Sequence, residues 1–149
     1  MPVKSLKEFL DKHHVKYVVM MHSPAFTAPE VAASAHVSGR IMAKTVVVKI
    51  DGRMAFVVVP ANDRVDLAHV RDVTGANSVD LAGEMEFRDK FAGCEVGAMP
   101  PFGNLYDLPV FVAEPLTQVD HIVFNAGSHA ELMQVAYEDF ARLVQPRVV

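Results

Sequence analysis

Lys44 is the residue that the sequence places best for chemistry. It directly precedes Thr45 to Ile50, a run of β-branched and apolar residues that is typical of a buried strand. A lysine at the start of such a strand is held on a rigid element, so its amine can bind a phosphate or polarise a carbonyl group. The same pattern also suits a lysine whose amine simply reaches solvent at a strand end. We take Lys44 as the candidate catalytic residue and keep the solvent-facing lysine as the alternative.

The segment from Gly97 to Gly103, Gly-Ala-Met-Pro-Pro-Phe-Gly, could bind a ligand through its backbone. Its adjacent prolines fix φ and stiffen the chain, while its glycines leave no side chain between the backbone and a ligand. N–H groups exposed on such a loop could hold a carboxyl, a carbonyl or a ribose. The alternative is a purely structural crossover between strands. The candidate binding residues here are Gly97, Pro101, Phe102 and Gly103.

A second polar cluster follows the short apolar run Ile122 to Phe124. Asn125, Gly127, Ser128 and His129 should gather at one edge of a sheet, where they could hydrogen-bond a substrate or position a water molecule. The alternative is an ordinary turn in which Ser128 caps a helix.

The other candidate groups are weaker. Cys94 is the only cysteine, and a thiol nucleophile would need it to ionise. Its neighbours Phe91 and Val96 suit a small core residue instead. The histidines show no metal-ligand spacing, and the chain has no Walker loop and no Gly-x-Ser-x-Gly elbow. We therefore expect neither a metal nor a cofactor.

A hairpin must carry Lys44. The apolar runs Thr45 to Ile50 and Met54 to Val59 are separated by Asp51-Gly52, the strongest two-residue hairpin signal. Because both runs are apolar on both faces, they should lie in the centre of a sheet that is covered on both sides.

Shorter elements surround this hairpin. Ser5 and Glu8 have the spacing of a capping box, which predicts a first helix, and a second helix is expected over Pro29 to Ala35. Further strands are expected at 17–21, 78–81, 110–113 and 122–124, further helices at 66–73, 84–91 and 138–144, and residues 129–137 fit either. This order predicts an α/β (α+β) fold, one domain over residues 1–149 with a mixed, mostly buried sheet.

The composition narrows the class of protein. With 51% hydrophobic and 21% charged residues the chain is globular, and 149 residues can bury enough apolar surface for one domain. A net charge of -4 gives no support for a protein that coats DNA or an anionic membrane, although it allows contact with one nucleic-acid end. No apolar run approaches the roughly 20 residues of a membrane span, and no signal peptide is evident. We expect a cytoplasmic protein.

Together and in this order, these segments resemble the YbaK/EbsC family of prolyl-tRNA synthetase-associated editing domains. The resemblance covers nearly the whole chain: His-Ser-Pro-Ala-Phe-Thr at 22–27, Ala-Lys-Thr-Val-Val-Val-Lys at 43–49, the loop 97–103 and Phe-Asn-Ala-Gly-Ser-His at 124–129. It implies an α/β domain around a mixed, barrel-like sheet. It also implies hydrolysis of aminoacyl-tRNA that carries the wrong amino acid, commonly alanine, cysteine or another small residue on tRNA for proline.

The family lysine corresponds to Lys44, and the family loop corresponds to Gly97, Pro101 and Gly103. The third motif departs from two branches of the family. The alanyl branch has a histidine-proline pair before its asparagine, and the cysteinyl branch has a glycine followed by basic residues. The amino acid that this chain removes therefore stays open.

The resemblance suggests a mechanism without a protein nucleophile. Lys44 would hold a phosphate or the ester carbonyl near the terminal adenosine, loop amides would stabilise the oxyanion, and water or a ribose hydroxyl would attack. We expect Lys44 and the loop 97–103 to face each other across one hollow, with Phe26, Thr27, Met42 and Phe102 as its walls. The expected partners are the 3′ end of a mischarged tRNA and, as a further option, prolyl-tRNA synthetase. A tRNA-end or synthetase-binding module without activity and a hydrolase of other activated esters are the alternatives.

Overall fold

A central hairpin organises the computed structural model, which describes residues 4–21, 29, 37–91 and 93–149. Strands β2 (Ala43–Ile50) and β3 (Arg53–Pro60) pair antiparallel along their whole length. Asp51 and Gly52 connect them with φ angles of 50° and 83°. Two positive φ angles in a two-residue turn match the right-handed twist of the strands, so the Asp-Gly prediction is confirmed.

The hairpin lies inside a five-stranded sheet whose order is β4-β2-β3-β5-β8. Strand β4 (Val79–Leu81) pairs antiparallel with β2, whereas β5 (Val110–Val112) and β8 (Arg147–Val148) extend the sheet in parallel from β3. The prediction that the hairpin strands are central is therefore confirmed.

A second, three-stranded sheet has the order β1-β7-β6 and is antiparallel throughout. Its strands are β1 (Tyr17–Met21), β7 (Glu131–Ala136) and β6 (His121–Asn125). A single parallel bridge between Met42 and Val123 joins the two sheets, with the N–H of Val123 donating to the carbonyl oxygen of Ile41 over 2.9 Å. The mixed α/β fold is confirmed, but the described strands form two linked sheets and no closed barrel.

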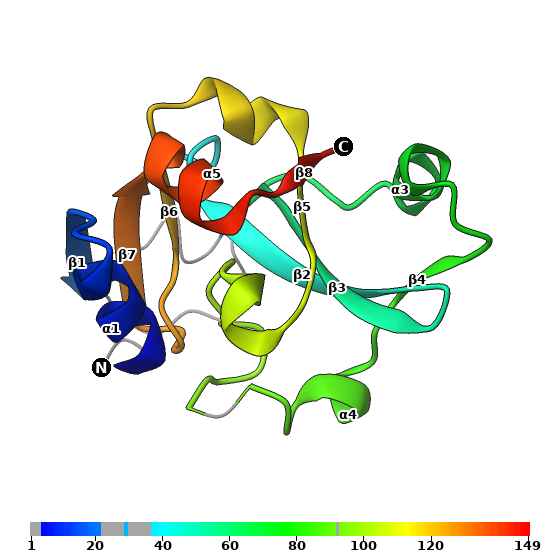
Figure 1. The fold of residues 1–149 in the computed structure, drawn as a ribbon, viewed down its shortest axis with the longest axis horizontal. Helices are drawn as coiled ribbons and strands as arrows, with labels where there is room; N and C mark the ends of the chain where they lie inside the picture. The colour runs from blue at the N-terminus through cyan, green and yellow to red at the C-terminus, as the bar shows by residue number, and fades with distance from the viewer. Residues whose placement is uncertain (1–3, 22–28, 30–36, 92) are drawn as a thin grey trace.

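Short helices pack around the sheets (Figure 1). Helices α1 (Lys4–Lys12) and α5 (Tyr137–Val144) lie near the three-stranded sheet, and α3 (Leu67–Thr74) lies at the opposite end of the molecule. The chain also forms α4 (Glu84–Phe87) and two 3₁₀ helices, η1 (Gly103–Tyr106) and η2 (Glu114–Gln118).

One predicted helix needs correction, and the choice left open for residues 129–137 is settled. The helix expected at 84–91 ends at Phe87, because the chain then turns, with the N–H of Lys90 bonded to the carbonyl of Phe87; both Phe87 and Phe91 thereby reach the core. Residues 131–136 form strand β7, since they pair on both sides, with β1 and with β6. The helix expected at 29–35 lies outside the described residues except for Pro29, which is helical.

The hairpin separates two apolar cores. The main core lies on one face and includes Ala43, Val47, Phe56, Val58, Met99, Phe102 and Phe124. The second core lies on the other face and includes Val48, Ala55, Val57, Val59 and Val70. A small bridge cluster, Met42, Ala61, Val123 and Leu132, packs where the two sheets join. Successive side chains of a strand point to opposite faces, so each hairpin strand supplies both cores.

Candidate functional site

Lys44 lies near the start of β2 and lines a recess of about 240 Å³. The other lining residues are Val46, Arg64, Val65, Leu67 and Leu81. Burial lowers the pKa of the Lys44 amine, the nearby Asp63 carboxylate opposes that effect, and the Arg64 guanidinium adds to it. Among the described residues, the amine has no hydrogen bond or ion pair. The structure therefore presents a half-buried amine beside the charged residues Asp63 and Arg64.

Asn125 points to the same side of the sheet as Lys44. The bridge pairs Met42 with Val123, and paired residues project to one face. Lys44 and Asn125 each lie two positions further along these parallel strands, so their side chains share that face. Asn125 is 7% exposed, and its Oδ1 accepts no hydrogen bond from any residue that the structure describes. A buried amide oxygen without a donor is costly, and a bound ligand with an N–H or O–H group would satisfy it.

Two of the three candidate features, the loop 97–103 and the polar residues after β6, lie next to each other in the structure. The N–H of Gly127 donates to the carbonyl oxygen of Ala98 over 2.9 Å, and Nε2 of His129 donates to the carbonyl oxygen of Val96 over 2.8 Å. Gly97 has a φ of +83°, and a Cβ there would lie 3.6 Å from Cε1 of His129. The exposed start of the loop is thus fixed against the end of β6.

The rest of the loop serves the core. Phe102 is fully buried, and its ring contacts those of Phe9, Phe124 and Phe140. Pro101 and Gly103 are buried as well, and a Cβ on Gly103 would lie 2.6 Å from the carbonyl oxygen of Leu108. Close packing accounts for this glycine. Only the start of the loop, at Gly97, is exposed to a ligand.

Lys44 and the buried part of the loop project to opposite faces of the hairpin, and the single hollow expected between them remains a prediction. Ala43 and Val47 face the main core, which contains Met99 and Phe102 of the loop, so Lys44 must face the other way. The two features meet instead at the end of β6, where Phe124 packs against Phe102 and Asn125 lies on the face of Lys44.

The remaining predicted site residues have structural contacts. Met42 is fully buried in the bridge cluster. Ser128 caps a turn, with its Oγ accepting the N–H of Ala130 over 3.3 Å, and a strand follows instead of a helix. Phe26 and Thr27 lie outside the described residues.

Cys94 is poorly suited to attack an ester. Burial raises the pKa of its thiol, and its Sγ lies 3.5 Å from the hydroxyl of Tyr106. A thiol held in its neutral form is a weak nucleophile. The described residues also contain no group of three or more His, Cys, Asp or Glu side chains arranged to hold a metal. No helix among them is long and apolar enough to cross a membrane.

Sequence reasoning missed the charged residues Asp63 and Arg64 beside Lys44. They follow Pro60 at the end of β3, which pairs antiparallel with β2. The residues after the second strand of a hairpin return to the start of the first strand, which is where Lys44 lies. Asp63 and Arg64 could therefore have been found from the hairpin geometry and from their charges.

A comparison with known families decides the class. The model of the family described as aminoacyl-tRNA editing domain matches residues 22–143. The chain belongs to this family. Over 113 residues this editing domain is 31% identical to the multifunctional Ser/Thr-tRNA deacylase ProXp-y of Escherichia coli (strain K12), and the match covers 72% of the chain and 66% of that protein. Over 90 residues it is 28% identical to the proline–tRNA ligase of Bacillus mycoides (strain KBAB4), covering 60% of the chain and 16% of the ligase.

Solved structures share the fold of this editing domain. One is a hypothetical protein with a TM-score of 0.86 at 21% identity, covering 97% of both chains. Another is a proposed trans-editing enzyme for prolyl tRNA synthetase with a TM-score of 0.80 at 22% identity, covering 98% of this chain and 93% of the other. At these identities the likeness concerns the fold.

Proposed function

We propose that this editing domain is a trans-editing hydrolase of the cytoplasm that deacylates mischarged aminoacyl-tRNA. Its substrate is tRNA for proline that carries a small wrong amino acid, such as alanine, cysteine or a related residue. Membership of the editing family supports hydrolysis of the aminoacyl ester. The observation that carries the proposal is the Lys44 amine, which is half-buried, lacks a partner among the described residues and shares a face with the unpaired amide oxygen of Asn125.

In this proposal the two side chains have different roles. The Lys44 ammonium holds a backbone phosphate or the ester carbonyl and stabilises the negative charge that develops on the carbonyl oxygen. The Asn125 Oδ1 accepts a hydrogen bond from the α-amino group of the amino acid, which fixes the ester in place. Water attacks the carbonyl carbon, the tetrahedral intermediate collapses, and the 3′ oxygen of the ribose leaves with a proton. An aminoacyl ester is already activated, so positioning and charge stabilisation suffice.

Selection among amino acids depends on the size and polarity of the pocket. One methylene group of the amino acid changes the free energy of binding in a pocket by only about 1–3 kcal/mol. A polar group of the pocket that one amino acid pairs with and another leaves unpaired discriminates between them more strongly. The relative from Escherichia coli is named a Ser/Thr-tRNA deacylase. Hydroxyl-bearing side chains must therefore be tested beside alanine and cysteine.

The test is a deacylation panel with tRNA for proline that carries alanyl, cysteinyl, seryl, threonyl or 2-aminobutyryl esters. The wild type should release at least one amino acid, and Lys44→Ala should lose about 100-fold in rate while it remains folded. Lys49→Ala is the matched control, because Lys49 lies on the same strand but pairs with Glu86 at 2.5 Å. Full activity of Lys44→Ala overturns the role of Lys44. Binding of every charged tRNA without release identifies a binding module instead of a hydrolase.

A further inference from the structure

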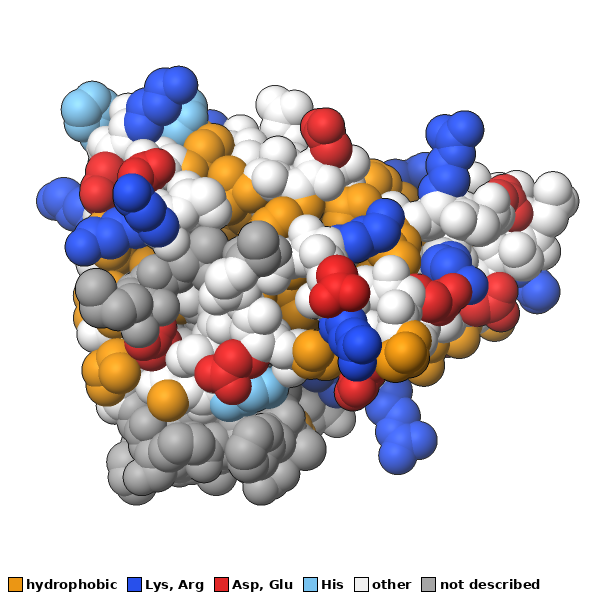
Figure 2. Space-filling model, turned by 90° about the horizontal axis from the view of Figure 1, so that it is seen from below, with side chains coloured by type: hydrophobic (Ala, Val, Ile, Leu, Met, Phe, Trp, Pro, Cys, Tyr) orange, Lys and Arg blue, Asp and Glu red, His pale blue; other side chains and the backbone are white. Residues whose placement is uncertain are grey.

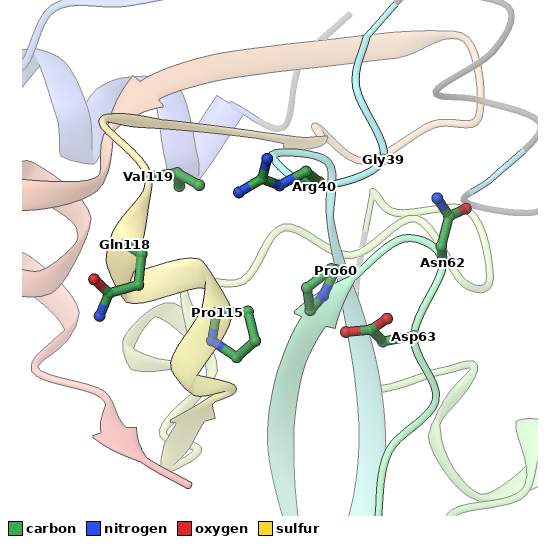
Figure 3. A pocket seen from close by; sticks show the side chains of 8 residues that line it. All are labelled: Gly39, Arg40, Pro60, Asn62, Asp63, Pro115, Gln118 and Val119. Carbon is green, nitrogen blue, oxygen red and sulfur yellow. The ribbon is translucent and has the colours of Figure 1, made fainter.

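A second hollow of about 380 Å³ lies beside the Lys44 recess (Figure 3). Three segments form it: the turn before β2, the end of β3 with the loop that follows it, and η2 with the residue after it. The lining residues are Gly39, Arg40, Pro60, Asn62, Asp63, Pro115, Gln118 and Val119. None of them belongs to the predicted site, and nothing in the mechanism above uses this hollow.

The lining combines apolar walls with a few polar groups. Pro60 and Pro115 come from different elements, the end of β3 and η2. Figure 3 shows Asp63 on the side of Pro60, with Arg40 and Val119 along another side. Arg40 and Asp63 are exposed, and neither side chain forms an ion pair or hydrogen bond with a described residue. A cavity of this size, with apolar walls and few convergent polar groups, is typical of small-ligand sites.

The loop after β3 connects the hollow to the proposed active site. Asp63 lines the hollow and acts electrostatically on Lys44, and the next residue, Arg64, lines the Lys44 recess. A ligand that extends from the recess into the hollow would therefore meet three cations, Lys44, Arg64 and Arg40, and one carboxylate. Figure 2 shows basic and acidic side chains interspersed on the face seen from below. The chain as a whole has a net charge of -4, so a local group of cations such as Lys44, Arg64 and Arg40 is where a polyanion can bind.

We propose that this hollow binds the nucleotide that precedes the terminal adenosine of the RNA substrate. Its base packs between Pro60 and Pro115, its exocyclic amino group donates to the Asp63 carboxylate, and its phosphate pairs with Arg40. This inference rests on the proposed function, because it assumes that the terminal adenosine carries its amino acid to Lys44.

The chemistry of the hollow favours cytidine at this position. A carboxylate accepts from the N4 amino group of cytosine but repels the O4 carbonyl of uracil. Single-stranded RNA ends are recognised through such base edges and through contact with the base faces. Every mature tRNA ends in cytidine, cytidine and adenosine, so the hollow matches the shared end of the substrates, whereas the amino acid is selected elsewhere.

The first test measures binding of an uncharged RNA minihelix by fluorescence anisotropy, and so does not depend on hydrolysis. Replacing the cytidine before the terminal adenosine by uridine should weaken wild-type binding about 10-fold, and Asp63→Ala should abolish that preference. Arg40→Ala should weaken binding of both RNAs equally and reduce the slope of log affinity against log salt by about 0.7. Arg53→Ala is the control, because Arg53 is an exposed arginine at the far end of β3.

The second test compares deacylation of aminoacyl-tRNA with that of an aminoacyl ester of adenosine alone. Arg40→Ala should slow the first reaction about 10-fold and leave the second unchanged. Equal effects on both substrates, no effect on either, or wild-type binding that ignores the base overturns the proposal. If wild type binds the minihelix with the cytidine preference but releases no amino acid, the proposed function fails and the nucleotide site stands.

Discussion

The N–H of Gly127 donates a hydrogen bond to the carbonyl oxygen of Ala98, over 2.9 Å. This bond joins the glycine-proline loop to the residues that follow β6, although the two segments are far apart in the sequence. It places the exposed Gly97 beside His129 and next to the strand end that carries Asn125. The loop can therefore affect the substrate only through its first residues.

Gly97→Ala tests this placement. The φ of +83° disfavours any residue with a Cβ, so the substitution should lower the free energy of unfolding by about 1 kcal/mol. It should also slow deacylation, because the start of the loop would move to relieve the strained φ. Gly52→Ala is a close match, with the same φ of +83° and nothing within 4 Å of the added Cβ. Urea unfolding should show similar losses for both variants, with only Gly97→Ala losing activity; equal activities would separate the loop from the site.

Phe102→Ala tests whether the loop phenylalanine belongs to the core or to the substrate pocket. Its fully buried ring contacts Phe9, Phe124 and Phe140, so truncation should cost about 3–5 kcal/mol of unfolding free energy. Met85→Ala, at a side chain that is 77% exposed, should change stability by less than about 0.5 kcal/mol. A stable Phe102→Ala protein with altered amino-acid preference would instead assign Phe102 to the pocket.

Cys94 should be dispensable for catalysis and slow to react. Burial raises the pKa of its thiol, so little thiolate exists at neutral pH. Iodoacetamide should alkylate the native protein much more slowly than the urea-unfolded chain at pH 8, and the single cysteine makes the signal unambiguous in mass spectrometry. Cys94→Ser should keep its deacylation rate. Loss of turnover in a folded Cys94→Ser protein would point to a thiol mechanism.

The sequence predicted those parts of the fold that depend on local patterns. Asp51-Gly52 sets the hairpin turn, and Asp66 and Gly75 cap α3 through a hydrogen bond to the N–H of His69 and a left-handed φ. By contrast, residues 131–136 became a strand only because β1 and β6 pair with them. Pairing between distant segments overrides local helix signals, and a single sequence does not show it.

For the candidate site, the sequence offered residues but not their arrangement. Lys44, Asn125 and Gly97 were proposed as site residues from residue type and position. The face on which Lys44 projects follows from the two-residue period of β2. The alternation of Ala43 with Lys44 separates the amine from the buried loop residues Met99 and Phe102. The bridge from Met42 to Val123, which gives Lys44 and Asn125 a common side, joins residues about 80 positions apart and has no local sequence signal.

The lowered pKa of Lys44 makes a specific prediction about stability and pH. In the folded protein the amine releases its proton at a lower pH than in the unfolded chain, whose value is near 10.5. Between these two pKa values the unfolded chain binds more protons, so the contribution of Lys44 to the unfolding free energy rises as pH increases. At neutral pH the charged amine is slightly destabilising. Lys44→Met should therefore be at least as stable as wild type at pH 7, although it loses deacylation.

Urea unfolding of wild type and Lys44→Met between pH 7 and pH 10 measures this effect. The other titrating groups are common to both proteins, so the difference in unfolding free energy isolates Lys44. It should favour Lys44→Met most at pH 7 and shrink as pH rises. A variant that is less stable at pH 7, with a gap that narrows at alkaline pH, would show that the folded protein prefers the charged amine. Lys44 would then be a structural cation, and its half-buried charge would not be held for a substrate.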